Sequence, residues 1–155
     1  MPKFEINNTG IKSIEELIEN GFDKKLLKTL KDLHYADIAE IIYELSTDQS
    51  TYLVKLLDSD KTADALAELD EDIREGILEN LSAKEIAEEI EELDTDDAAD
   101  LIAELPEGRQ ERVMSQISDS EHVEDIRELL TYDENTAGGL MAKELVKVEE
   151  SLSVL

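Results

Sequence analysis

The chain has 155 residues, of which 15 are Lys or Arg and 41 are Asp or Glu, so its formal net charge is −26. This charge argues against phosphate-rich partners such as nucleic acids and anionic membrane surfaces, and it favours metal cations or a basic protein. The absence of cysteine excludes disulfides, thiolate metal sites and cysteine nucleophiles. No apolar run approaches the roughly 18 residues that a membrane-spanning helix needs. Because 41% of the residues are apolar and regularly spaced, we expect a folded chain.

Residues 1–23 are expected to form an N-terminal lead helix or extension. Ser13 is placed to cap a short helix that carries Ile14 and Leu17 and ends at Asn20-Gly21. The pattern does not define the register of this segment against the rest of the chain.

A regular pattern occupies residues 24–130. Apolar residues recur every twelve positions and end nine successive units: Leu33, Leu45, Leu57, Leu69, Leu81, Leu93, Leu105, Ile117 and Leu129. Three positions before each of them stands a second apolar residue: Leu30, Ile42, Val54, Leu66, Leu78, Ile90, Ile102, Met114 and Ile126. Nine matches in nine units indicate a structural repeat.

Each unit is predicted to be one short helix followed by a tight turn. The residue after the terminal Leu or Ile is a helix-capping type in six units: Ser46, Asp58, Asp70, Ser82, Asp94 and Ser118. Pro106 takes the same place in one further unit. Ser82 and Glu85 have the spacing of a capping box. Helices of eight or nine residues are marginal in isolation and must stack to bury their apolar faces.

The predicted fold class is therefore all-α, a right-handed superhelix or solenoid of short helices with a half-repeat of about twelve residues. A weaker period of 24 residues places a small residue early in every second helix, at Ala39, Ala63 and Ala87. Two helices would then form the full repeat, with the alanines at close contacts between helices.

The pattern breaks at Thr131. Gly138-Gly139 is the only pair of adjacent glycines and is predicted to form a corner. After it, 145–149 alternates apolar and polar residues, as a strand does. Residues 131–155 are thus predicted to be a connector followed by the truncated beginning of another domain.

The string Tyr132-Asp-Glu-Asn-Thr-Ala-Gly-Gly-Leu-Met141, with Val146-Lys-Val148 after it, resembles a junction in magnesium transporters of the MgtE family. In that family a cytosolic helical superhelix runs into a pair of CBS domains. Asp97-Ala-Ala-Asp-Leu-Ile-Ala-Glu-Leu-Pro106 is similar to that superhelix. The resemblance covers about 24–155 and implies that the next domain is a CBS domain.

The resemblance also implies a function. The chain would be the cytoplasmic regulatory domain of an inner-membrane magnesium transporter that acts as a homodimer. Mg²⁺ would bind between its acidic faces and its own CBS domains and close the transmembrane pore. By position in the family, Asp64, Asp96 and Asp100 would contact the metal, and Asp97 is the reserve candidate.

Two other interpretations stay open. These carboxylates can equally be a solvated helix face whose charges complement helix N-termini. The whole chain can instead be an acidic helical-repeat scaffold that docks a basic protein, as in flagellar motor switch adaptors. An enzyme is not expected, because no nucleophile or base has a recognisable catalytic context. His34 and His122 stand alone and are expected to be ordinary helix residues.

Overall fold

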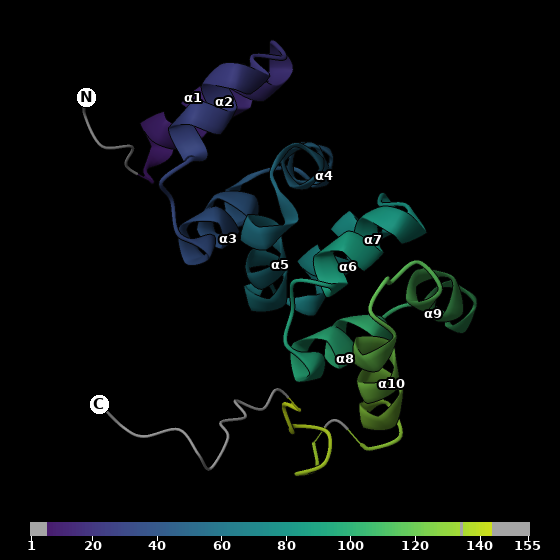
Figure 1. The fold of residues 1–155 in the computed structure, drawn as a ribbon. Helices are drawn as coiled ribbons and strands as arrows, with labels where there is room; N and C mark the ends of the chain where they lie inside the picture. Colours follow the sequence, from purple (N-terminus) through teal and green to yellow (C-terminus); the bar gives the residue numbers. More distant parts are fainter. Residues whose placement is uncertain (1–5, 134, 144–155) are drawn as a thin grey trace, which may run out of the picture.

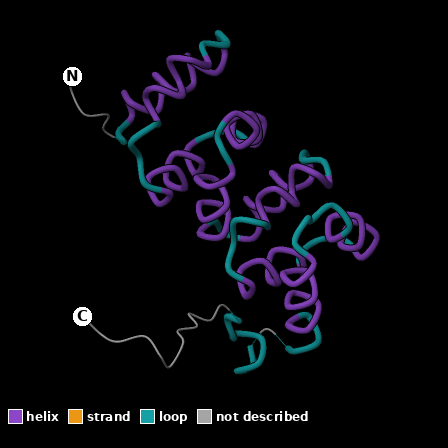
Figure 2. Tube along the Cα trace, viewed as in Figure 1, coloured by secondary structure: helices purple, strands orange, loops and turns teal. Residues whose placement is uncertain are grey.

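A computed structural model describes residues 6–133 and 135–143. All regular structure in these two ranges is α-helical, which confirms the all-α prediction (Figures 1 and 2). The helices are α1 (Asn8–Glu19), α2 (Asp23–Leu30), α3 (Tyr35–Glu44), α4 (Thr47–Leu56), α5 (Ser59–Glu68), α6 (Glu71–Glu79), α7 (Ala83–Ile90), α8 (Thr95–Ala103), α9 (Glu107–Met114) and α10 (Ser120–Leu129). None of them is both long and apolar enough to cross a membrane.

Helices two apart in the chain pack on each other. α3 contacts α5, α5 contacts α7, α7 contacts α9, and in the alternate row α4 contacts α6 and α8 contacts α10. The chain thereby advances as a staircase from the α1–α2 pair to α10 (Figure 1). Since a helix and its stacking partner lie 24 residues apart, the alanines of this period fall at the contacts. Ala39, Ala63 and Ala87 are all buried.

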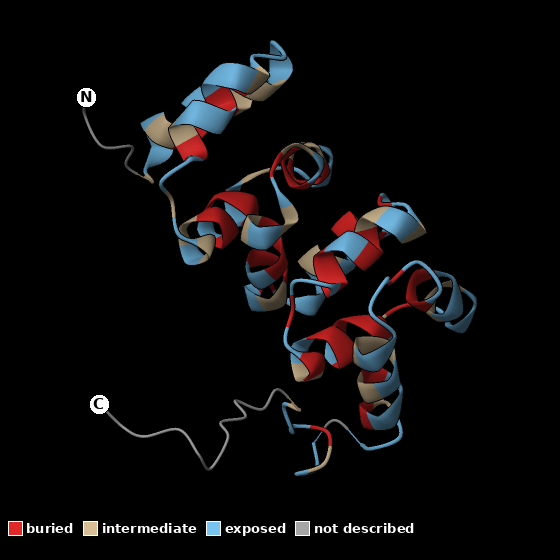
Figure 3. Cartoon of the chain, in the orientation of Figure 1, coloured by how far each residue is buried: buried red, intermediate tan, exposed pale blue. Residues whose placement is uncertain are grey.

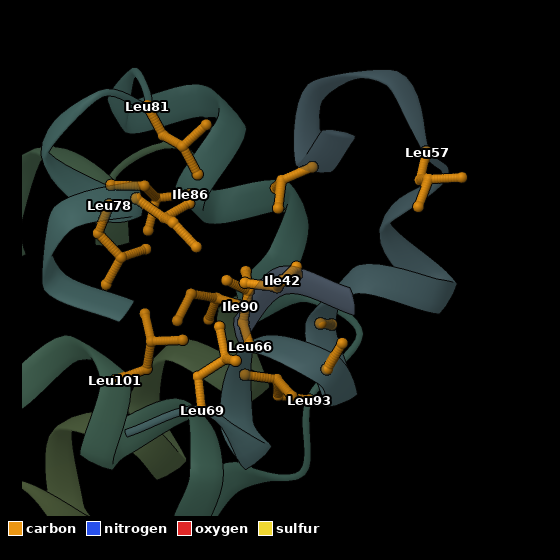
Figure 4. Close-up of a cluster of buried hydrophobic side chains, with 14 of the residues drawn as sticks. Ile42, Leu57, Leu66, Leu69, Leu78, Leu81, Ile86, Ile90, Leu93 and Leu101 are labelled. Carbon is orange, nitrogen blue, oxygen red and sulfur yellow. The ribbon is translucent and has the colours of Figure 1, made fainter. Parts of the chain in front are cut away.

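The core follows the twelve-residue register. The residues three positions before each unit end are at most 5% exposed in all nine units. Figure 4 shows Ile42, Leu66 and Ile90 converging from α3, α5 and α7. Full burial of such a side chain stabilises a fold by about 1.5–3 kcal/mol. Figure 3 shows the resulting pattern, with buried stripes inside and exposed faces outside on each helix.

Most of the predicted helix starts are confirmed. Ser46 and Ser82 each form a capping box, with Gln49 and Glu85 as their partners. Asp58, Asp70 and Asp94 also stand at N-cap positions, as does Pro106, but none of these four makes a side-chain capping hydrogen bond. The Ser118 prediction is wrong by one residue. Asp119 is the cap of α10, and Ser118 instead contacts Glu91.

Two expectations near the N-terminus are also wrong. Ser13 lies in the middle of α1, because Asn7 caps this helix by accepting from the amides of Thr9 and Gly10. The predicted end at Asn20-Gly21 is confirmed, and Gly21 adopts a left-handed φ of 64°. His34 is the N-cap of α3 in a capping box with Asp37, rather than a residue inside a helix.

The Gly138-Gly139 corner lies in a series of turns after α10. A Cβ atom at Gly138 would lie 2.6 Å from the ring of Tyr132, so only glycine permits this close approach. The predicted strand over 145–149 and the predicted start of a CBS domain lie outside the described residues.

Candidate metal-binding face

Helix α8 carries three of the four candidate aspartates. Asp96 and Asp97 lie in its first turn, where carboxylates complement the helix dipole, and Asp100 lies one turn further on. The opposite face of the helix is apolar and buried at Ala98 and Ile102. This burial holds α8 in a rotation that turns Asp97 and Asp100 to solvent and leaves Asp96 partly exposed.

Asp64 of α5 belongs to the same electrostatic neighbourhood. The pKa of Asp97 is raised, first by partial burial of its carboxyl and then by the negative charges of Asp96, Asp100, Asp94 and Asp64. Two helices that are separated by about 30 residues of chain thus place their carboxylates within reach of one another's field. Such a face favours the binding of a cation, because the binding relieves the mutual repulsion.

Arg74 interacts electrostatically with Asp100, but its guanidinium is already engaged elsewhere. Arg74 pairs with Glu104, and its guanidinium also donates to the carbonyl groups of Leu66, Ala67 and Leu69. The pKa of Arg74 is raised mainly by Glu104, with a smaller contribution from Asp100. Arg74 therefore stabilises the end of α5 and compensates Glu104 more than it compensates the aspartates of α8.

The described part of the connector, residues 131–133 and 135–143, is hydrogen-bonded to the start of α8. The backbone amide of Lys143 donates to the hydroxyl of Thr95 over 3.0 Å, although 48 residues separate the two. The ammonium group of Lys143 lies 2.8 Å from Asp125 and 2.5 Å from Glu128, both on α10. The described chain therefore leaves the helical stack directly next to Asp96.

Apolar side chains remain uncovered in the same connector. Tyr132 is 46% exposed, Leu140 68% and Met141 41%. These residues belong to the Tyr132–Met141 string that resembles the family junction. An apolar surface of this kind is typical of a segment that another domain covers.

The aspartates do not form a complete metal site by themselves. Among the described residues, no group of three or more His, Cys, Asp or Glu side chains is arranged to hold a metal ion. Their chemistry nevertheless fits Mg²⁺, which prefers oxygen ligands, keeps several of its waters and needs only one or two carboxylates from a protein. Asp64, Asp96, Asp97 and Asp100 thus offer suitable oxygen ligands but no complete ligand set among the described residues.

The structure also contains an acidic residue that sequence reasoning missed. Glu89 of α7 is only 5% exposed and lies between helices, where the Thr62 hydroxyl is 2.7 Å from Oε2 and 2.9 Å from Oε1. Burial raises the pKa of Glu89 to about 7, against the lowering effect of the Thr62 hydrogen bond. A hollow of about 290 Å³ adjoins it, and Lys55, Asp58, Glu85 and Glu88 contribute to the walls.

The position of Glu89 within its repeat unit could have indicated from the sequence that its carboxylate is buried. Glu89 occupies the position four residues before the unit end. Six other units place a buried apolar residue there: Ile41, Leu53, Ala65, Ile77, Leu101 and Val113. The remaining two units place Thr29 and Asp125 there, so a comparison of the units by position would have marked Glu89 as one of three departures.

A stack of short helices with an acidic face near its C-terminal end places the chain in the class of all-α repeat domains. The profile of the MgtE intracellular N domain family matches residues 33–135 of the chain. The chain therefore belongs to the family of the MgtE intracellular N domain. No relative is found among curated protein sequences.

Two solved structures share the fold. One is the soluble part of a magnesium transporter, with 25% identity and a TM-score of 0.74 over 88% of this chain. The other is the cytosolic domain of the Mg²⁺ channel MgtE in complex with ATP, with 26% identity and a TM-score of 0.75 over 85% of this chain. This chain spans 54% of each of those chains.

Proposed function

We propose that this chain is the magnesium-sensing regulatory domain on the cytoplasmic side of an MgtE-type channel or transporter. The observation that carries the proposal is the position of Lys143. Its backbone amide donates to the hydroxyl of Thr95, so the last described residue lies next to the aspartates at the start of α8. The similarity to the cytosolic domain of a Mg²⁺ channel supports the same assignment.

In this proposal Asp96 and Asp100 bind Mg²⁺ together with a surface of the CBS domains of the same protein. Asp64 contributes from α5, and Asp97 adds negative charge to the face. When Mg²⁺ is scarce, repulsion between acidic surfaces separates the domains. When Mg²⁺ is abundant, the cation binds the closed arrangement and shifts the population toward it. Closure then holds the transmembrane pore of the homodimer shut.

The exposed side chains of the connector support this arrangement. Leu140 and Met141 offer an apolar contact for the domain that follows, and the aspartates lie beside that contact. A domain seated on the connector would face α8 without a long linker. The family match favours this function over that of a scaffold for a basic protein.

The test is a thermal melt of the chain with Mg²⁺ and with NaCl at matched ionic strength, on the wild type and on Asp96→Asn plus Asp100→Asn. A site with a millimolar dissociation constant at about 10 mM Mg²⁺ stabilises by about 1 kcal/mol. This corresponds to a rise in Tm of roughly 2–4 °C beyond the salt control. We expect the double variant to lose that extra rise.

The matched control is Glu75→Gln plus Glu79→Gln on α6. Both residues are exposed, and they have the same spacing of four on one helix. This variant removes two charges as well, and it should keep the Mg²⁺ response. The Mg²⁺-dependent shift is compared rather than the absolute Tm, because Asp96 also stabilises the N-terminus of α8. The same melt on a chain extended through the next domain should show a larger shift, and equal responses to Mg²⁺ and NaCl in both lengths would refute the proposal.

A further inference from the structure

The net charge is distributed unevenly along the chain. Residues 1–31 contain six lysines against five acidic residues, a net charge of +1. Residues 32–155 contain nine Lys or Arg against 36 acidic residues, a net charge of −27. Since the two parts together give −26, the total conceals an end of the protein whose charge differs from the rest.

The cations of the two parts also differ in what they contact. After residue 31, every described Lys and Arg makes an ion pair or donates a hydrogen bond: Lys55, Lys61, Arg74, Lys84, Arg109, Arg112, Arg127 and Lys143. Within residues 6–31, by contrast, no ion pair or donated side-chain hydrogen bond involves the ammonium groups of Lys12, Lys24, Lys25, Lys28 or Lys31. The protein thus leaves its lysines unpaired in one place only among the described residues.

Four of these lysines share the outward face of α2 and its C-cap. Leu26 and Leu30 lie on the other side of the helix and are fully buried. At 100° per residue, Lys24, Lys25, Lys28 and Lys31 fall within about 120° on the opposite side. The only acidic residue of α2, Asp23, accepts a hydrogen bond from the Tyr52 hydroxyl on α4. We call the face formed by the four lysines the lysine face.

Two apolar side chains border the lysine face. Phe22, directly before α2, is 57% exposed and Leu27 is 39% exposed. Beside Phe22 lies a hollow of about 560 Å³ that Gly21, Asp23, Lys24 and Lys25 also line. Figure 1 places the α1–α2 pair at the free end of the staircase, away from α8 and α10. Figure 3 shows that most of its outer surface is exposed.

We propose that the lysine face, with Phe22 and Leu27, docks on an anionic phospholipid surface. Lysines with exposed Phe and Leu beside them match the interface between headgroups and acyl chains, where the ammonium groups pair with phosphates and the apolar groups enter the boundary. Each lysine near an anionic leaflet contributes about a fivefold gain in affinity. The strongly negative remainder is repelled by the same surface, so the α1–α2 end turns toward it.

The proposal rests on the proposed function in one respect, because a channel's membrane part would hold this domain near a bilayer. Tethering raises the effective concentration and lets a weak surface contact operate. A second copy of this chain is a less favourable occupant. Two molecules of charge −26 repel each other, and contact between the lysine face and an acidic helix would be heterologous and would not close into a dimer.

The experiment is flotation of the 155-residue chain with vesicles of pure phosphatidylcholine or with about one third phosphatidylglycerol. A chelator is present throughout, so that divalent ions cannot bridge carboxylates to lipid. We expect binding only to the anionic vesicles, with loss of binding in high salt. Lys24→Gln plus Lys28→Gln should weaken it about thirty-fold, equivalent to about 2 kcal/mol. Phe22→Ala should weaken it several-fold in a way that salt changes little.

The matched control is Lys84→Gln plus Arg112→Gln, which changes the net charge equally at two exposed positions on α7 and α9. It should bind like the wild type. Equal weakening by both pairs, or no binding to anionic vesicles, would overturn the proposal. Self-association without vesicles that the Lys24 and Lys28 variant abolishes would assign the face to a second copy instead. The Mg²⁺ melt on the same variant keeps the two proposals separate, because the lysine variant should lose vesicle binding and retain the Mg²⁺ response.

Discussion

The α1–α2 pair and the stack of α3–α10 are built from similar short helices but follow different rules. In the stack, the twelve-residue register decides which side chain is buried, and every described cation is engaged. In the α1–α2 pair, α1 lies outside this register and only α2 follows it, through Leu30, and the described lysine side chains make no ion pair or donated hydrogen bond. The stack is thus specified by its internal contacts, whereas α1–α2 presents groups to something outside.

This difference has a consequence for stability. A helix inside a stack of repeats has neighbours on both sides, and a terminal helix has them on one side only. α5 packs against α3 and α7, whereas the main contacts of α1 are with α2 and α4. Local opening should therefore require less free energy at α1–α2 than in the middle of the stack.

Leu66→Ala would break the stack itself and is the largest effect that we predict. Leu66 is fully buried at the centre of the core shown in Figure 4. Its truncation should lower the free energy of unfolding by about 2–5 kcal/mol, through lost burial and a cavity. Urea denaturation followed by circular dichroism measures the change. Leu27→Ala, on the exposed side of α2, is the control and should change the stability by less than about 0.5 kcal/mol.

Glu89 sharpens the comparison, because it is a buried carboxylate at a position that six other units fill with a buried apolar residue. The pKa of its carboxyl is about 7 in the folded protein, and 4.5 is the ordinary value. Between pH 4.5 and about pH 7, Glu89 is therefore protonated in the folded state and ionised in the unfolded state. The stability of the fold falls as the pH rises through this range. The contribution is fully present below pH 4.5 and is lost above about pH 7, with a size of about 2–3 kcal/mol.

Glu89→Gln should remove this part of the pH dependence and make the protein more stable at pH 8. Glutamine keeps an acceptor for the Thr62 hydroxyl, while its burial carries no charge penalty. The measurement is the free energy of unfolding at pH 5 and pH 8 for the variant and the wild type. Glu75→Gln on the exposed side of α6 is the control for general charge repulsion. If both variants flatten the pH dependence equally, the effect does not belong to Glu89.

The part of the fold that the register governs could be predicted from the sequence, because burial in short stacked helices repeats with the chain. The positions from Leu30 to Ile126, the capping boxes at Ser46 and Ser82 and the end of α1 were all predictable on local grounds. The prediction that Ser13 caps α1 was wrong because the local sequence is compatible with a helix that begins after Ser13 and with one that begins after Asn7. Asn7, one turn and a half earlier, provides better acceptors for free amides.

The candidate site was harder to predict from the sequence than the fold. Asp96 and Asp100 could be paired from their spacing alone, whereas the proximity of Asp64 depends on the stacking of distant helices. The fastening of Lys143 to Thr95 spans 48 residues and has no sequence signal. The lysine face was hidden for another reason: net charge is a sum, and a large negative total conceals a small positive surface.

Asp97→Asn is the smallest effect that we predict, and it tests the acidic face from within. The pKa of Asp97 is raised by partial burial and by its aspartate neighbours, so its charge disfavours the folded state at neutral pH. Because the group is exposed and screened, its removal should stabilise the chain by only a few tenths of a kcal/mol. Mg²⁺ should remove most of this difference in stability between the variant and the wild type, since a cation bound among the aspartates already relieves the repulsion. NaCl at the same ionic strength should leave the difference largely unchanged. If NaCl reduces the difference as strongly as Mg²⁺ does, the face is a diffuse charged surface and the neighbouring carboxylates do not act together on one ion.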